Sequence, residues 1–184
     1  MAHGNNPQRM VSLAAMIPLI NRDNSCCFSG YRPEKLPWGA NEADPRCKAL
    51  KDGILVAAER IYLFGTRHFI CGMARGSDMY FCEALFLLRE KRSDVTLEAA
   101  IPYKAQAANW PEDDRYRYNG LIGKCDYVTY VSEAYSKNCM LRRNRYMVDN
   151  SSVLLAVYDG KPGGTSYTIK YAARRRLDII EIEP

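Results

Sequence analysis

The sequence predicts an α/β fold, a Rossmann-like three-layer sandwich with a mostly parallel central sheet. Short apolar runs alternate with longer segments in which apolar residues recur every three or four positions, as expected for buried strands alternating with amphipathic helices. Turn residues separate these segments. The chain has 184 residues, of which 47% are hydrophobic and 26% charged, and this composition suits one soluble domain with a sizeable core.

The first strand is predicted at residues 26–30, an apolar run that a glycine closes. After a loop rich in turn residues, Asp44 and Pro45 are typical of a helix N-cap and first turn. Apolar residues then recur at steps of three and four as far as residue 65, which predicts one buried stripe on this helix. The stripe consists of Leu50, Ile54, Ala57, Ile61 and Phe64.

The same alternation continues to the C-terminus. Further strands are predicted at about 68–72, 95–101, 127–132, 153–158 and 178–183. Helices are predicted at about 77–91, 138–150 and 164–176, and residues 105–124 are expected to hold one or two short helices. In open sheets of this kind, ligands bind outside the carboxyl ends of the strands. Functional residues are therefore sought directly after each strand.

Glycine-containing segments follow three of these strands, and they are the first candidates for ligand binding. Glycines before a helix allow backbone N–H groups to approach an anion at the positive end of the helix dipole. An arginine there can form a forked contact with phosphate. Ser77 or Asp78 is expected to cap the helix that follows. Alternatively, Asp78 accepts hydrogen bonds from a ribose or a base. The candidates in these segments are Gly30, Arg32, Gly72, Gly76, Asp78, Gly163, Gly164 and Thr165.

The helix after the fourth strand supplies two more candidates. Its apolar stripe contains Met140, Leu141, Met147 and Val148, and Asn144 lies on the same face by helical spacing. A buried amide needs a partner, which is either a structural network or a ligand. Of the neighbouring arginines, Arg143 is the one we expect to point into the crevice.

The cysteines and histidines exclude some chemistry. The seven cysteines form no CxxC pair and several lie in apolar runs, so we expect buried thiols in a reducing cytoplasm and no metal site. The chain has only two histidines, His3 and His68, so histidine-based catalysis is not expected.

The N-terminus and the net charge set two further expectations. Residues 10–20 are apolar but too few to span a membrane, so residues 1–24 are expected to be a loose leader outside a domain at 25–184, with no membrane partner. The net charge of +5 is mild, and we therefore do not expect a nucleic acid as partner.

Together these segments resemble the YpsA-like branch of the SLOG superfamily, which also contains the lonely-guy phosphoribohydrolases and the DprA/Smf proteins. The matching motifs are Gly30-x-Arg32-Pro33, Gly72-x-x-x-Gly76-x-Asp78, Arg143-Asn144-x-x-Met147-x-Asp149, and Tyr158-Asp159-Gly160 followed by Gly163-Gly164-Thr165. The resemblance implies a Rossmann-like fold and a site for a nucleotide or nucleotide sugar, with no certain cofactor. It also implies a homo-oligomer, since relatives often form dimers or larger assemblies.

One departure from the lonely-guy pattern leaves the function open. In the last loop, those hydrolases have a motif similar to PGGxGTxxE, in which the glutamate serves catalysis. This chain has Ser166, Tyr167 and Thr168 after Thr165, with no glutamate nearby. Cleavage of an N-glycosidic bond needs a carboxylate, and the substitutes are Asp78, Glu83 and Asp149. The leading hypothesis is binding or sensing of a nucleotide-derived small molecule. The alternatives are an N-glycosidic hydrolase, a DprA-like single-strand binder and a protein-interaction module.

Overall fold

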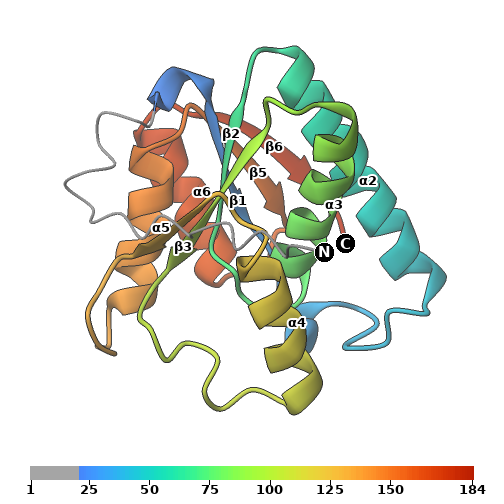
Figure 1. Cartoon of the computed structure of the whole chain (residues 1–184), viewed down its shortest axis with the longest axis vertical. Coiled ribbons are helices and arrows are strands. Elements are labelled where there is room, and N and C mark those ends of the chain that lie inside the picture. The colour runs from blue at the N-terminus through green and yellow to red at the C-terminus, as the bar shows by residue number, and fades with distance from the viewer. Residues whose placement is uncertain (1–20) are drawn as a thin grey trace, which may run out of the picture.

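The computed structural model describes residues 21–184, and the predicted fold class is confirmed (Figure 1). Most of the predicted leader, residues 1–20, lies outside the described residues. The 3₁₀ turn η1 (Arg22–Asn24) is joined to the domain, because the Arg22 side chain donates to the carbonyl oxygens of Ser151 and Arg175. No helix within residues 21–184 is long and apolar enough to cross a membrane.

Six strands form one sheet in the order β4-β3-β2-β1-β5-β6, and all five strand pairs are parallel. The strands are β1 (Ser25–Ser29), β2 (His68–Cys71), β3 (Thr96–Ile101), β4 (Tyr127–Tyr130), β5 (Val153–Val157) and β6 (Asp178–Ile182). The chain builds outward from β1 to β4 and then returns to the other side of β1 with β5. After β1 the chain leads to α2 on one face of the sheet, and after β5 it leads to α6 on the other face. A doubly wound sheet opens a crevice where the connections diverge in this way.

The helices cover both faces of the sheet, as Figure 1 shows. They are α2 (Pro45–Leu63), α3 (Ser77–Lys91), α4 (Glu112–Ile122), α5 (Cys139–Asp149) and α6 (Gly164–Arg174), with a short 3₁₀ helix η2 (Pro33–Lys35) in the loop after β1. A large apolar core joins α2, α3 and α4 to one face, and a smaller core joins α5 and α6 to the other. Every residue of β1 is buried, as expected for a central parallel strand.

Two local predictions are corrected by the structure. Phe64 does not continue the buried stripe of α2: it follows the last helical residue and is 93% exposed, while Ala58 rather than Ala57 is fully buried. The helical period holds within α2 but ends with the helix, so the Phe64 side chain lies outside the core.

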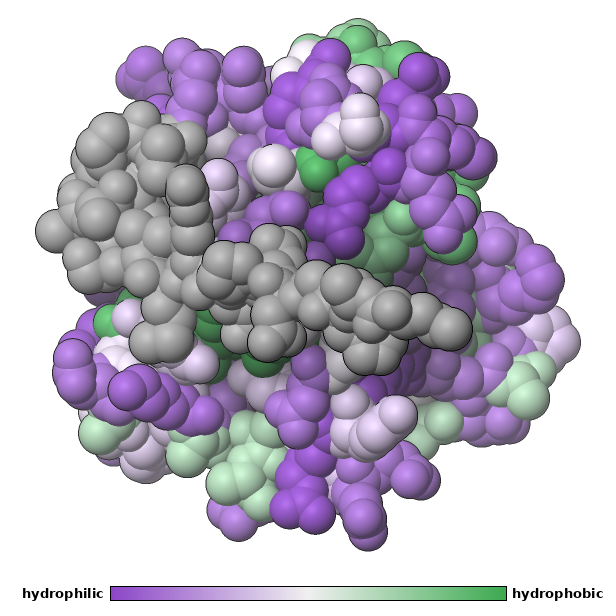
Figure 2. Space-filling model, viewed as in Figure 1, coloured by the Kyte–Doolittle hydropathy of each residue, from purple (hydrophilic) through white to green (hydrophobic). Residues whose placement is uncertain are grey.

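Where the described residues are visible in Figure 2, the surface is mostly hydrophilic, with hydrophobic residues in separate small areas.

These exposures predict opposite costs for two truncations in α2. Ile54 is fully buried, so Ile54→Ala should lower the free energy of unfolding by about 2–5 kcal/mol. Phe64→Ser should change it by no more than about 0.5 kcal/mol. Urea unfolding followed by circular dichroism measures both, and a large loss for Phe64→Ser would show that this side chain is covered in solution.

Candidate functional site

A cavity of about 310 Å³ lies at the predicted crevice. Its walls are the end of β1 and the following loop, the loop after β2 with the start of α3, the first turns of α5, and the start of α6. Seven of the ten predicted ligand-binding residues line it: Gly30, Arg32, Asp78, Arg143, Asn144, Gly164 and Thr165. Gly72, Gly76 and Gly163 do not line it.

Arg143 is the most unusual group in the cavity wall. It projects from α5 toward the sheet and is only 5% exposed. Its Nε and Nη1 atoms are buried and have no hydrogen-bond partner within residues 21–184. Burial lowers the pKa of the guanidinium, and the nearby Asp78 carboxylate only partly opposes this effect. A buried charge with unmade hydrogen bonds is costly, so its retention suggests a ligand that compensates it.

Gly72 makes room for the Arg143 guanidinium. A Cβ atom on Gly72 would lie 1.5 Å from Arg143 Nη1, so any other residue would displace the side chain. Asp78 supplies the nearest opposite charge, with its Oδ2 atom 3.9 Å from Nη1. The same oxygen accepts the backbone N–H of Ala74 at 3.0 Å. Asp78 therefore pins the loop after β2 rather than capping α3, whose N-cap is Gly76.

The loops after β1 and β2 are joined at Gly76. This residue has φ +79°, which favours glycine, and a Cβ there would lie 2.7 Å from the carbonyl oxygen of Tyr31. The same carbonyl accepts the N–H of Ser77 at 3.0 Å. Neither predicted cap acts as one, because the start of α3 is bound to the neighbouring loop instead. Gly76 thus holds the two loops together behind the cavity.

The start of α6 faces the cavity with free backbone donors. Its N-cap, Gly163, provides no side-chain hydrogen bond, and the N–H groups of Gly164 and Thr165 have no acceptor within residues 21–184. The Thr165 hydroxyl points to the carbonyl oxygen of Gly30 at 3.4 Å. Lys35 Nζ donates to the carbonyl oxygen of Pro162 at 3.1 Å, beside this helix end. Free amides, a helix dipole and a lysine together favour an anion.

Asn144 and Arg32 occupy different positions in the wall. Asn144 Nδ2 donates to the Thr168 hydroxyl at 2.9 Å, so its amide joins α5 to α6 while its side chain borders the cavity. Arg32 is exposed and lines the cavity, and its guanidinium makes no hydrogen bond or ion pair with another described residue. Its guanidinium is therefore available to a ligand at the entrance.

The charges and surfaces of the cavity suit an anion with an attached apolar group. Arg32, Lys35 and Arg143 supply positive charge, while the carboxylates of Asp78 and Glu34 are already partnered. Glu34 pairs with Arg75 at 2.9 Å. Phe28, Met140 and Met147 supply apolar wall. Within residues 21–184, no group of three His, Cys, Asp or Glu side chains is placed to hold a metal ion.

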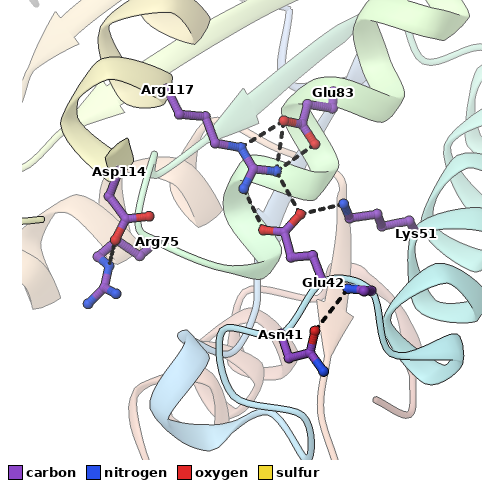
Figure 3. Close-up of polar contacts among 8 residues, drawn as sticks. Asn41, Glu42, Lys51, Arg75, Glu83, Asp114 and Arg117 are labelled. Atoms are coloured by element: carbon purple, nitrogen blue, oxygen red, sulfur yellow. Dashed lines mark hydrogen bonds and ion pairs between the residues drawn. The ribbon is translucent and has the colours of Figure 1, made fainter. Parts of the chain in front are cut away.

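Two of the three candidate catalytic carboxylates lie away from the cavity. Glu83, on α3, is bound to Arg117 of α4 at 2.8 Å, in a network with Glu42 and Lys51 (Figure 3). Asp149 ends α5 near the amino end of β5, on the opposite edge of the sheet, and pairs with Arg175 at 2.7 Å. Of the three, only Asp78 is placed to reach a ligand in the cavity.

The sequence profile of the YpsA SLOG family matches residues 26–180. The chain belongs to this family. It is 29% identical over 147 residues to the uncharacterized SPbeta prophage-derived protein YoqJ of Bacillus subtilis (strain 168), covering 73% of this chain and 86% of that one. It is 28% identical over 132 residues to a UPF0398 protein of Halalkalibacterium halodurans, covering 70% and 68%. The resemblance seen in the motifs is thus confirmed.

Solved structures of DNA-processing protein A share the fold of this YpsA SLOG family member. The Streptococcus pneumoniae protein superposes with a TM-score of 0.59 and 16% identity over 86% of this chain and 50% of its own. This chain thus corresponds to about half of that protein. The Helicobacter pylori protein, which binds single-stranded DNA, gives a TM-score of 0.60 and 13% identity over 90% and 67%. At these identities the likeness shows the fold alone, and nucleic acid stays open as a partner.

Among the wall residues that sequence reasoning did not predict, Lys35 and Tyr31 are the most informative. Lys35 belongs to η2, and its side chain reaches the start of α6. Tyr31 packs beside Lys35, and its hydroxyl donates to Asp159. This bond and burial raise the pKa of Tyr31 to about 12. Both residues belong to the loop after β1, in which the sequence predicts Arg32 as a ligand-binding residue. A lysine in a loop carries no periodic signal, so only the folded loop reveals its place.

The buried pair of Asp78 and Arg143 predicts an unusual double-mutant cycle. Arg143→Met leaves a buried carboxylate unpaired and should lower the free energy of unfolding by about 3 kcal/mol. Adding Asp78→Asn removes that carboxylate, so the double variant should recover to within about 1 kcal/mol of the parent protein. Chemical denaturation of the four proteins measures the cycle. Additive losses would contradict the prediction, because they would show that the two side chains contribute to stability independently of each other.

Proposed function

We propose that the cavity binds a nucleotide-derived small molecule through its phosphate and holds it without turnover. The observation that carries the proposal is the buried guanidinium of Arg143, whose Nε and Nη1 atoms have no hydrogen-bond partner within residues 21–184. Arg143 and the free amides of α6 border one cavity, so an anionic group there would gain hydrogen bonds and charge compensation. Membership of the SLOG family supports a ligand of this class.

The size and lining of the cavity support a small ligand. A volume of about 310 Å³ lies at the lower end of the range for ligand sites, which favours a mononucleotide-sized molecule over a larger one. The apolar side chains of Phe28, Met140 and Met147 can pack against a base or a sugar face. Arg32 and Lys35 at the mouth would then contact a second anionic group. Binding without turnover is the simplest function that uses all these groups.

A matched pair of variants at Gly164 tests the anion site. A Cβ atom at this position meets nothing within 4 Å, so neither Gly164→Ala nor Gly164→Asp should disturb the fold. The aspartate places a negative charge at the helix start that the ligand phosphate should occupy. In a thermal-shift screen of nucleotides, ADP-ribose, NAD and nucleotide sugars, Gly164→Ala should keep the ligand-dependent shift and Gly164→Asp should abolish it.

Two results would contradict the proposal. The first is the absence of any shift with the parent protein at millimolar ligand. The second is an equal shift with both Gly164 variants. Arg142→Ala serves as a further control, because Arg142 neighbours Arg143 in sequence but is exposed, and its side chain donates only to the Ser136 hydroxyl among the described residues. It should bind the ligand as the parent protein does.

A second candidate function is hydrolysis of the N-glycosidic bond of the bound nucleotide. The observation that favours it is the Asp78 carboxylate in the cavity wall, since such a reaction needs a carboxylate near the sugar. Burial raises the pKa of Asp78, with the Arg143 charge and the Ala74 amide opposing.

Product analysis separates the two functions. If the cavity only binds, ligand incubated with the protein overnight should be recovered intact by ion-exchange chromatography. Release of free base and sugar phosphate, lost by at least about 100-fold in Asp78→Asn, would establish the hydrolase instead. Release that persists unchanged in Asp78→Asn would point to a contaminating enzyme and leave the binding proposal in place.

A further inference from the structure

The net positive charge of the chain comes from one segment. Residues 139–176 contain eight of the 26 lysines and arginines but only two of the 21 acidic residues, so this segment carries +6 and the rest of the chain −1. The mild net charge of +5 therefore averages a strongly basic part with a nearly neutral one. A basic cluster on one face is the electrostatic signature of a surface for polyanions.

The segment contains α5 and α6, which lie side by side on one face of the sheet (Figure 1). One of its arginines, Arg143, is buried in the cavity wall, and Lys161 lies in the loop before α6. The other six cations are exposed along the two helices and the residues that end α6. We call them the basic face: Arg142, Arg145, Lys170, Arg174, Arg175 and Arg176.

The protein hardly neutralises this face. Asp149 is the only acidic residue of α5 and α6, and it is taken up by Arg175 at 2.7 Å and by the Tyr171 hydroxyl at 3.1 Å. Lys170, Arg174 and Arg176 form no ion pair with any residue of 21–184. Elsewhere in this range some surface cations are paired with carboxylates, as in Lys48–Asp52 and Lys91–Glu59, and others are not. On the basic face, five of the six cations have no carboxylate partner within residues 21–184, since only Arg175 forms an ion pair.

Arg145 shows what kind of contact the face offers. Its guanidinium lies 5.7 Å and 5.6 Å from the ring centres of Tyr167 and Tyr171, and its Nε donates to the Tyr167 hydroxyl at 2.8 Å. The two rings are already covered and do not present a free platform for stacking bases. No large hydrophobic side chain is exposed on α5 or α6. Charge and arginine forks remain, which suit phosphates.

We propose that the basic face binds the phosphate backbone of a nucleic acid without reading its base sequence. Five of the six cations are arginines, which pair with phosphate in a forked geometry. The lack of an exposed apolar anchor on these helices disfavours insertion into a lipid surface. The face is separate from the cavity, so this inference does not depend on the nature of the cavity ligand.

Fluorescence anisotropy with a labelled 20-base-pair DNA duplex tests the inference over a range of NaCl concentrations. The triple variant Arg142→Gln, Lys170→Gln, Arg174→Gln should weaken binding at least about tenfold at 100 mM NaCl. It should also reduce the slope of log K against log[NaCl] by about 2–3, because each lost phosphate contact removes counterion release.

A control triple variant removes the same charge elsewhere: Arg60→Gln, Lys91→Gln and Arg115→Gln, all exposed residues of α2, α3 and α4. It should bind the duplex with a slope close to that of the parent protein. Equal losses in the two triple variants would overturn the inference, because only net charge would then matter.

Two other outcomes would also overturn it. One is no duplex binding by the parent protein at 50 mM NaCl. The other is binding to phosphatidylserine vesicles in place of the duplex, which would assign the face to a membrane surface. Thermal unfolding of every variant confirms that it is folded, and an unchanged shift with the cavity ligand shows that the cavity is intact.

Discussion

The arrangement of the site depends on one constraint, the burial of the Arg143 guanidinium against the backbone of Gly72. The guanidinium occupies the space of a Cβ atom, so the loop after β2 must carry a glycine at that position. Asp78 then has two tasks, since it partners Arg143 and fixes the Ala74 amide of the same loop. Because the start of α3 is also bound to Tyr31, the loops after β1 and β2 form one wall around a guanidinium whose Nε and Nη1 atoms have no hydrogen-bond partner in the described chain.

The parallel topology explains why these distant segments meet. After β4 the chain crosses back and adds β5 on the other side of β1. The strands β1 and β5 are therefore neighbours, although more than a hundred residues separate them in sequence. The carboxyl end of each strand delivers its loop to the same edge, and α5 and α6 both begin there. One edge thus collects an arginine from α5, the amides of α6 and the cations of the loop after β1.

Individual residues show which features of the fold and of the site could be predicted from the sequence. The strand positions and Arg143 were predictable, because alternation and helical period report which side chains face inward. The roles of Gly72 and Gly76 were not, since a glycine beside a strand end looks alike whether it approaches a ligand or, as here, a buried arginine and a neighbouring carbonyl. Glu83 lies on α3 together with Asp78, but it binds Arg117. Asp149 lies on α5 together with Arg143, but it binds Arg175. Neither partner could be identified before the fold was known.

The contacts of Asp78 weigh on the choice between binding and hydrolysis. A carboxylate that assists bond cleavage must reach the sugar and exchange a proton or stabilise developing charge there. Asp78 is 4% exposed, and its Oδ2 atom already accepts the Ala74 amide and faces Arg143. Using it for chemistry would release the loop that shapes the cavity. Its structural task therefore competes with a catalytic one, whereas a bound phosphate beside Arg143 satisfies the site without asking Asp78 to move, and this favours a receptor for the ligand over an enzyme that consumes it.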